Sequence, residues 1–238
     1  MKRNLLLSGG PVHDFDATSA AIASLLASGD GGPIETTIVS DPRNVLERLC
    51  PETRDGAEQW DLLTVNALHW RMEIERYAHL RDRDAFDLNR ADGELISGFV
   101  HAGGGLLAMH TAVICFDAES HWRALIGAAW NWDRSSHPPV AELAVQITEA
   151  GRRHPITAGI EPFGIVDELY GLLDDADAIE PLLTATRDGV VHPLLWARPV
   201  GNGRVVTDLL GHGVESLTHP AHRTILQRAA QWSLGRAA

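Results

Sequence analysis

A histidine stands where an α/β enzyme would carry its catalytic nucleophile. Residues 103–112 read GGGLLAMHTA, in which three glycines precede a short apolar run and then His110. Small residues, Ala108 and Ala112, stand two positions to either side, as in the tight strand-to-helix turn that raises one side chain above a sheet. Acyl transfer at such a turn requires Ser or Cys. Histidine there indicates proton transfer or metal ligation instead.

Further polar side chains follow the ends of other predicted strands: His13 and Asp14, Asn66 and His69, and His212. In open α/β sheets, ligands bind beyond the carboxyl ends of the strands, so we expect these residues to converge with His110. Loops are expected to bring further groups over the same edge: His137, Asp167, Glu168, and the wall residues Trp130, Trp132 and Tyr170.

Each of these residues also has a structural interpretation. His110 could be a buried histidine that bonds to a backbone carbonyl, and Glu168 could cap a helix or pair with an arginine. Other histidines are expected at the surface, in predicted helices or polar segments: His79, His101, His121 and His222. Imidazole and carboxylate groups without a thiolate suit zinc, manganese or iron. The sequence lacks an HExxH-like spacing that would decide for a metal.

The composition excludes several classes of partner. The formal net charge of -12 argues against nucleic acid and anionic membranes, which both require a basic surface. Cys50 and Cys115 have no CxxC partner, so we expect two buried thiols in a reducing compartment. No apolar run approaches the ~20 residues that span a bilayer. A cytoplasmic protein with a single domain over residues 1–238 is the expectation.

The elements that must position the site alternate along the chain. Strands are predicted for residues 5–8, 34–40, 60–66, 106–109, 140–148, 193–198 and 203–210. Helices are predicted for residues 16–27, 91–102 and 219–234, with a short one that begins at Asp41-Pro42. This alternation favours an α/β fold with a doubly wound, parallel sheet.

Several of these segments, in this order, resemble the ThuA-like (trehalose-utilisation) family of the class I glutamine amidotransferase-like superfamily. They are residues 13–14, 103–112, 125–128, 137–139, 154–160, 167–170, 192–198 and 201–212. The resemblance implies a flavodoxin-like, mainly parallel sheet and a role in sugar or keto-sugar catabolism. True glutamine amidotransferases carry Cys at the elbow and a His-x-Glu pair. Here His110 and the pair His212 and Val214 replace them, which excludes the thioester route of a glutaminase.

Within this resemblance, the site is expected to act on a keto-sugar or a disaccharide as an isomerase, lyase or hydrolase. His110, His212 and Glu168 would be the acid–base groups. The substrate-binding residues would be His13, Asp14, His137, Asp167, Tyr170 and Trp130. A divalent metal (Zn, Mn or Fe) is a variant of the same site, with His110, His137 and His212 as candidate ligands.

One alternative belongs to another class of function. The chain would then be a catalytically silent module that binds a sugar or assembles with a dehydrogenase, because a fold alone does not establish chemistry. The seven tryptophans also leave a homo-oligomer open.

Overall fold

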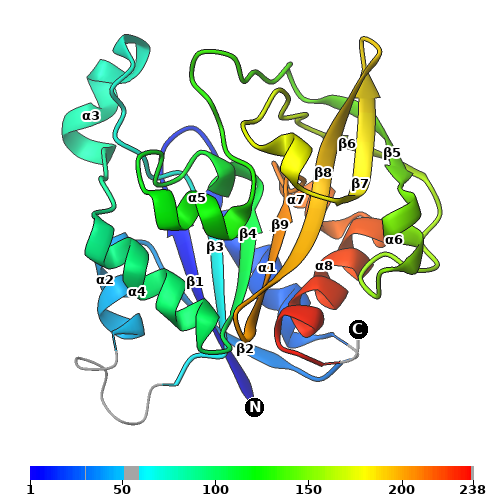
Figure 1. Cartoon of the computed structure of the whole chain (residues 1–238), viewed down its shortest axis with the longest axis horizontal. Helices are drawn as coiled ribbons and strands as arrows, with labels where there is room; N and C mark the ends of the chain where they lie inside the picture. The colour runs from blue at the N-terminus through cyan, green and yellow to red at the C-terminus, as the bar shows by residue number, and fades with distance from the viewer. Residues whose placement is uncertain (30, 51–58, 237–238) are drawn as a thin grey trace.

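The strands form one sheet with a parallel half and an antiparallel half (Figure 1). The computed structural model describes residues 1–29, 31–50 and 59–236. The strand order is β2-β1-β3-β4-β9-β8-β7-β5-β6. The strands are β1 Lys2–Gly9, β2 Ile34–Val39, β3 Leu62–Ala67, β4 Gly105–Met109, β5 Ala141–Ile147, β6 Phe163–Asp167, β7 Pro181–Arg187, β8 Val190–Val200 and β9 Gly203–Asp208.

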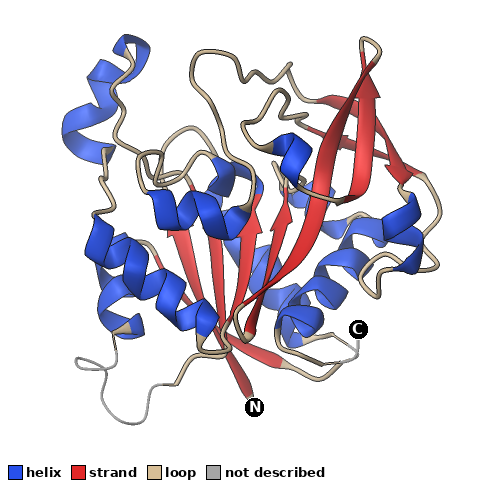
Figure 2. Ribbon diagram, in the orientation of Figure 1, coloured by secondary structure: helices blue, strands red, loops and turns tan. Residues whose placement is uncertain are grey.

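Helices cover both faces of the parallel half, which comprises β2-β1-β3-β4-β9 (Figure 2). One face carries α1 (Phe15–Ala27), α7 (Val214–Thr218) and α8 (Pro220–Ser233). The other carries α2 (Pro42–Leu49), α4 (Arg90–His101) and α5 (Ser120–Ile126). The remaining α-helices are α3 (Ala78–Asp84) and α6 (Glu149–Arg153). This arrangement confirms the expected doubly wound α/β fold.

The β1 sequence shows why a parallel strand reads as a continuous apolar run. Leu5 and Leu7 pack into the core beneath α2 and α4, whereas Leu6 packs into the core beneath α1 and α8. Successive side chains point to opposite faces, and both faces are buried. The strand therefore shows no polar alternation.

The antiparallel half consists of β8, β7, β5 and β6. Sequence analysis did not predict β6 or β7. Four successive antiparallel pairings separate β9 from β6, so β6 again runs in the direction of β9. The end of β6 reaches the loop after β9, where an oxygen of Asp167 accepts a hydrogen bond from the Gly211 amide at 2.8 Å. The residue after β6, Glu168, therefore lies at the same edge as the ends of the parallel strands.

The opposite edge shows close packing between β9 and α4. A Cβ atom on Gly203 would overlap the carbonyl oxygens of Val100 and Gly104. We expect Gly203→Ala to lower the free energy of unfolding by about 1–3 kcal/mol, the usual effect of overpacking. Gly98 on the same helix has no described atom within 4 Å of its Cβ position, so Gly98→Ala should stabilise by up to about 1 kcal/mol. Urea unfolding measures both; equal stability of the two variants would contradict this packing.

Candidate functional site

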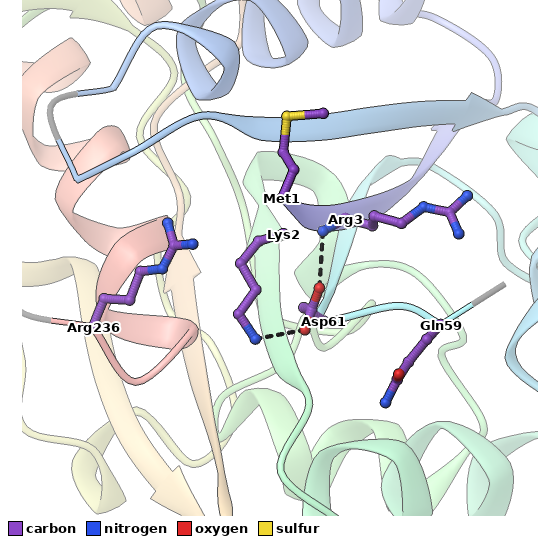
Figure 3. A pocket seen from close by; sticks show the side chains of 6 residues that line it. All are labelled: Met1, Lys2, Arg3, Gln59, Asp61 and Arg236. Atoms are coloured by element: carbon purple, nitrogen blue, oxygen red, sulfur yellow. Dashed lines mark hydrogen bonds and ion pairs between the residues drawn. The ribbon is translucent and has the colours of Figure 1, made fainter. Parts of the chain in front are cut away.

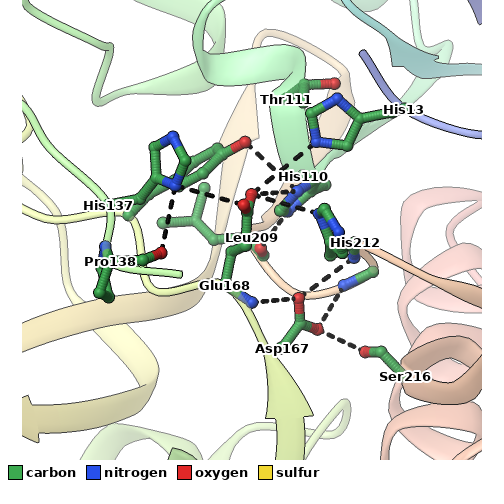
Figure 4. A network of polar contacts seen from close by, with 12 residues as sticks. His13, His110, Thr111, His137, Pro138, Asp167, Glu168, Leu209, His212 and Ser216 are labelled. Atoms are coloured by element: carbon green, nitrogen blue, oxygen red, sulfur yellow. Dashed lines mark hydrogen bonds and ion pairs between the residues drawn. The ribbon is translucent and has the colours of Figure 1, made fainter. Parts of the chain in front are cut away.

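Three histidines and one carboxylate from four separate loops meet at the carboxyl edge of the sheet (Figure 4). His13 follows β1, His110 follows β4, Glu168 follows β6 and His212 lies shortly after β9. One nitrogen or oxygen atom from each lies within 4.8 Å of all the others. Glu168 Oε2 is 3.2 Å from His212 Nδ1, 3.3 Å from His110 Nε2 and 3.8 Å from His13 Nε2. We call these residues the four-residue cluster.

His110 occupies the strand-to-helix turn that its sequence indicates. Its φ of 45° lies in the left-handed region, which is strained for a residue with a side chain. A 3₁₀ turn over His110–Val113 follows directly, and Ala108 and Ala112 are fully buried. His110 Nδ1 is 2.8 Å from the Leu209 carbonyl oxygen. Because a carbonyl only accepts, Nδ1 carries a hydrogen, and Nε2 is the ring nitrogen that faces the cluster.

Several buried atoms of the cluster have no hydrogen-bond partner in the described part of the chain. They are both ring nitrogens of His13, Oε2 of Glu168 and Nδ1 of His212. Buried polar atoms are normally hydrogen-bonded. The closest nitrogen–oxygen separations, 3.2 and 3.3 Å, match the spacing of about 3.3 Å between tetrahedral zinc ligands at their usual bond lengths. The donor set therefore fits a divalent cation.

The carboxylate of Glu168 sets the charge balance. Burial alone would raise its pKa, but the imidazoles of His110, His13 and His137 hold that pKa well below its usual range. Burial likewise acts to lower the pKa of His110, yet contact with Glu168 and the nearby Asp167 raises it. For His212, burial dominates and lowers the pKa. The site thus contains a firmly ionised carboxylate.

Aromatic and imidazole side chains surround the cluster. His137 Nδ1 lies 3.2 Å from Glu168 Oε1 and 3.3 Å from the Pro138 carbonyl oxygen, so it contacts the other carboxylate oxygen and stands outside the four-residue cluster. The Tyr170 ring stacks on His110 at 4.7 Å, with its hydroxyl 3.3 Å from His110 Nε2. Trp130 packs against Tyr170 and His137 at 5.3 and 6.0 Å.

Two carboxylates have uses other than the substrate contact expected of them. Asp14 is exposed and caps α1, because its Oδ1 accepts a hydrogen bond from the Ala17 amide at 3.0 Å. Asp167 is fully buried and accepts hydrogen bonds from the amides of Glu168, Gly211 and His212. Aspartate at the start of a helix or beside a loop readily binds backbone amides, and the sequence alone does not separate that use from substrate binding.

Two further expectations change with the structure. Asn66 donates to the hydroxyls of Thr18 and Ser19, and His69 packs against Phe86 at 6.3 Å; neither belongs to the cluster. The surface position expected for His222 is wrong. Its ring is fully buried and contacts Asp208, because it lies on the face of α8 that packs on the sheet.

A pocket at the opposite edge of the sheet lacks comparable chemistry (Figure 3). Its central carboxylate, Asp61, pairs with the Lys2 ammonium at 2.6 Å and accepts the Arg3 amide at 2.9 Å. These contacts neutralise the charge and tie the start of β1 to the segment before β3. We interpret this pocket as structural.

Comparison with known proteins then places the chain in a family. The family model for ThuA, described as trehalose utilisation, matches residues 78–233, more than half of the chain. The chain belongs to the ThuA family. The curated proteins contain no match. In the described part of the chain, all helices are too short or too polar to cross a membrane.

Solved structures resemble this ThuA-family chain over its whole length. A ThuA-like protein of Parabacteroides merdae has a TM-score of 0.74 and 17% identity, with 100% of this chain and 91% of that chain covered. A cytoplasmic protein of Salmonella typhimurium has a TM-score of 0.63 and 13% identity, with 98% and 99% covered. A β-galactosidase from Rahnella sp. R3 has a TM-score of 0.57 and 14% identity, with 99% of this chain but 32% of the enzyme covered. At these identities the similarity concerns the fold.

Cys115, close to the elbow, should be chemically silent. Burial raises the pKa of its thiol to about 12, and Sγ donates to the Ala67 carbonyl at 2.9 Å. Because the thiolate is the reactive form, iodoacetamide at pH 8 should leave Cys115 unmodified in the folded protein and label it in urea. Peptide mass spectrometry measures this; rapid labelling of the folded chain would contradict the assigned environment.

Proposed function

We propose that this ThuA-family protein is a metal-dependent enzyme that acts on a keto-sugar or disaccharide by acid–base chemistry and has no glutaminase activity. The main support is the convergence of His13, His110, Glu168 and His212, where several buried ligand atoms lack hydrogen-bond partners among the described residues. The sugar class rests on the family description, trehalose utilisation. The absence of glutaminase activity rests on His110 at the elbow and on the protonated thiol of Cys115.

The four-residue cluster would hold the metal ion. Three imidazoles and one carboxylate are a ligand set suited to zinc, manganese or iron. When bound, such an ion polarises a carbonyl or hydroxyl oxygen of the substrate. Tyr170 lies beside this ligand set. Burial raises the pKa of its hydroxyl well above the usual value, so the hydroxyl stays protonated, 3.3 Å from His110 Nε2.

His137 is the residue that we assign to proton transfer. Its Nδ1 faces two acceptors, the Pro138 carbonyl and Glu168, which leaves the lone pair of the neutral ring on Nε2. Its side chain is 42% exposed, more than that of any residue in the four-residue cluster. The Nε2 atom would take the proton from a carbon next to the ketone, and the electron pair would move onto the ketone oxygen. In isomerisation, the imidazolium then gives that proton to the former ketone carbon, and the hydroxyl proton of the deprotonated carbon moves to the former ketone oxygen. In elimination, the electron pair returns from the oxygen, the bond from the neighbouring carbon to the glycosidic oxygen breaks, and the imidazolium protonates that oxygen.

A groove beside His137 supports a substrate larger than one sugar ring. It has a volume of about 380 Å³, within the range of small-molecule sites. Its lining includes His137, Leu169, Leu172, Arg187, Asp188 and His192. Arg187 and Asp188, at the turn between β7 and β8, offer hydrogen-bond donors and acceptors for hydroxyl groups, and the leucines offer an apolar wall.

The metal is tested with the isosteric variant Glu168→Gln. The wild type should contain one divalent ion per chain, and chelation should abolish its turnover of 3-keto-disaccharides. The variant should bind metal roughly 100-fold or more weakly, since even an indirect partner of a ligand is worth about 10–100-fold. Elemental analysis and competition with a chelator measure both.

His154→Gln is the matched control for this variant. The His154 ring is half-buried and packs on Trp232 at 5.1 Å, away from the cluster, so metal affinity should not change. Turnover that persists unchanged without metal would contradict the metal assignment. A metal-free protein with no turnover of keto or unmodified disaccharides would contradict the enzyme assignment and favour the binding module.

His137→Gln separates proton transfer from metal binding. Glutamine can keep a hydrogen bond to Glu168 but is not a base at neutral pH. We expect turnover to fall about 10²–10⁴-fold, the usual contribution of general acid–base catalysis, while the metal content stays that of the wild type. A variant that loses the metal together with turnover would instead make His137 a ligand.

A further inference from the structure

Two buried carboxylates hold the loops that carry the four-residue cluster. Asp167 accepts hydrogen bonds from the amides of Glu168 at 2.8 Å, Gly211 at 2.8 Å and His212 at 3.1 Å. It therefore fixes the backbone of two cluster residues at once. Figure 4 shows Asp167 between the end of its strand and the loop that carries His212.

The second carboxylate, Asp208, controls the orientation of His110. Its Oδ1 accepts the Leu210 amide at 3.1 Å. The residue between them, Leu209, presents its carbonyl oxygen to His110 Nδ1 at 2.8 Å. The turn that Asp208 closes therefore supplies the acceptor that directs His110 Nε2 into the cluster.

The buried side chain of His222 links the two carboxylates: it contacts Asp208 directly and reaches Asp167 through Ser216. Its Nε2 is 3.0 Å from Asp208 Oδ2, and its Nδ1 is 3.0 Å from the Ser216 carbonyl oxygen and 3.1 Å from Ser216 Oγ. Ser216 Oγ in turn donates to Asp167 Oδ2 at 2.5 Å. All four residues are at most 2% exposed.

The partners of His222 define its charge. A carboxylate and a backbone carbonyl only accept hydrogen bonds, so both ring nitrogens must donate and the ring is an imidazolium. Burial acts to lower the pKa of His222, but Asp208 and Asp167 raise it. A buried cation beside two buried carboxylates also avoids the large cost of leaving those charges unpaired.

We propose that Asp208, His222, Ser216 and Asp167 form one positioning unit, in which a charged His222 holds the loops at residues 167–168 and 208–212 so that His110, Glu168 and His212 meet. Its effect on metal binding rests on the proposed function; its effect on the loops does not. The contacts run from Ser216 to His222 to Asp208, which are the residue types of a catalytic Ser–His–Asp triad. The Ser216 hydroxyl is 2% exposed and already donates to Asp167, so it is a positioning residue and not a nucleophile.

The test compares His222→Gln with the control His154→Gln in the full chain. A glutamine at residue 222 is neutral and donates hydrogen bonds only from its NH2 group, so it cannot replace both donors of the imidazolium. We expect amide hydrogen exchange to accelerate at least about tenfold at Glu168, Gly211 and His212, with β1 unchanged, because local opening is measured residue by residue. Zinc affinity, measured by competition with a chelator, should fall about 10–100-fold. The control should change neither.

Two further measurements keep the proposal falsifiable if His222→Gln does not fold. In the wild type, nitrogen NMR of His222 should show both ring nitrogens protonated at pH 7. Ser216→Ala, which removes only the hydroxyl bridge, should accelerate exchange at the same three amides. A His222 ring with one bare nitrogen, or unchanged exchange in a folded His222→Gln or Ser216→Ala protein, would overturn the proposal. If the wild type binds none of zinc, manganese and iron, the proposed function fails, while the NMR and exchange results still decide the positioning unit.

Discussion

A buried carboxylate among four imidazoles is the constraint that organises this molecule. The Glu168 side chain is 9% exposed and lies within 3.8 Å of His13, His110, His137 and His212. An ionised group at such a position requires a compensating cation. Protons on the imidazoles or a metal ion among them can provide it. Three of these imidazoles, those of His13, His110 and His212, face the same Glu168 oxygen within 3.8 Å. This crowding favours the metal, because three imidazolium rings so close together would repel one another.

The fold meets this constraint by bringing distant loops to one edge. Parallel strands place the residues after β1, β4 and β9 side by side, and the antiparallel half returns β6 in the same direction. His110 adopts a left-handed φ of 45°, which costs about 1–3 kcal/mol and persists only where neighbouring structure enforces it. The Leu209 carbonyl and the stacked Tyr170 ring provide that enforcement.

The sequence predicts the parallel half because its signals are local. Short apolar runs next to glycines mark β1 and β4, and small residues around His110 mark the turn. The strands β6 and β7 escape prediction because FGIVD and PLLTATR lack the alternation of a half-buried strand. The role of Asp167 follows from amides 44 and 45 residues away, and His222 meets a carboxylate 14 residues away. Such pairings depend on which strands become neighbours in the sheet, and a local sequence pattern does not predict that.

Anomalous X-ray diffraction from crystals of the protein, recorded on both sides of the zinc, manganese and iron absorption edges, tests the central claim most directly. The account predicts one anomalous peak between Glu168 Oε2 and the ring nitrogens of His13, His110 and His212, with bond lengths of about 2.0–2.2 Å if the ion is zinc. A map without such a peak from metal-supplemented crystals, in which the imidazoles instead donate hydrogen bonds to Glu168, would contradict it.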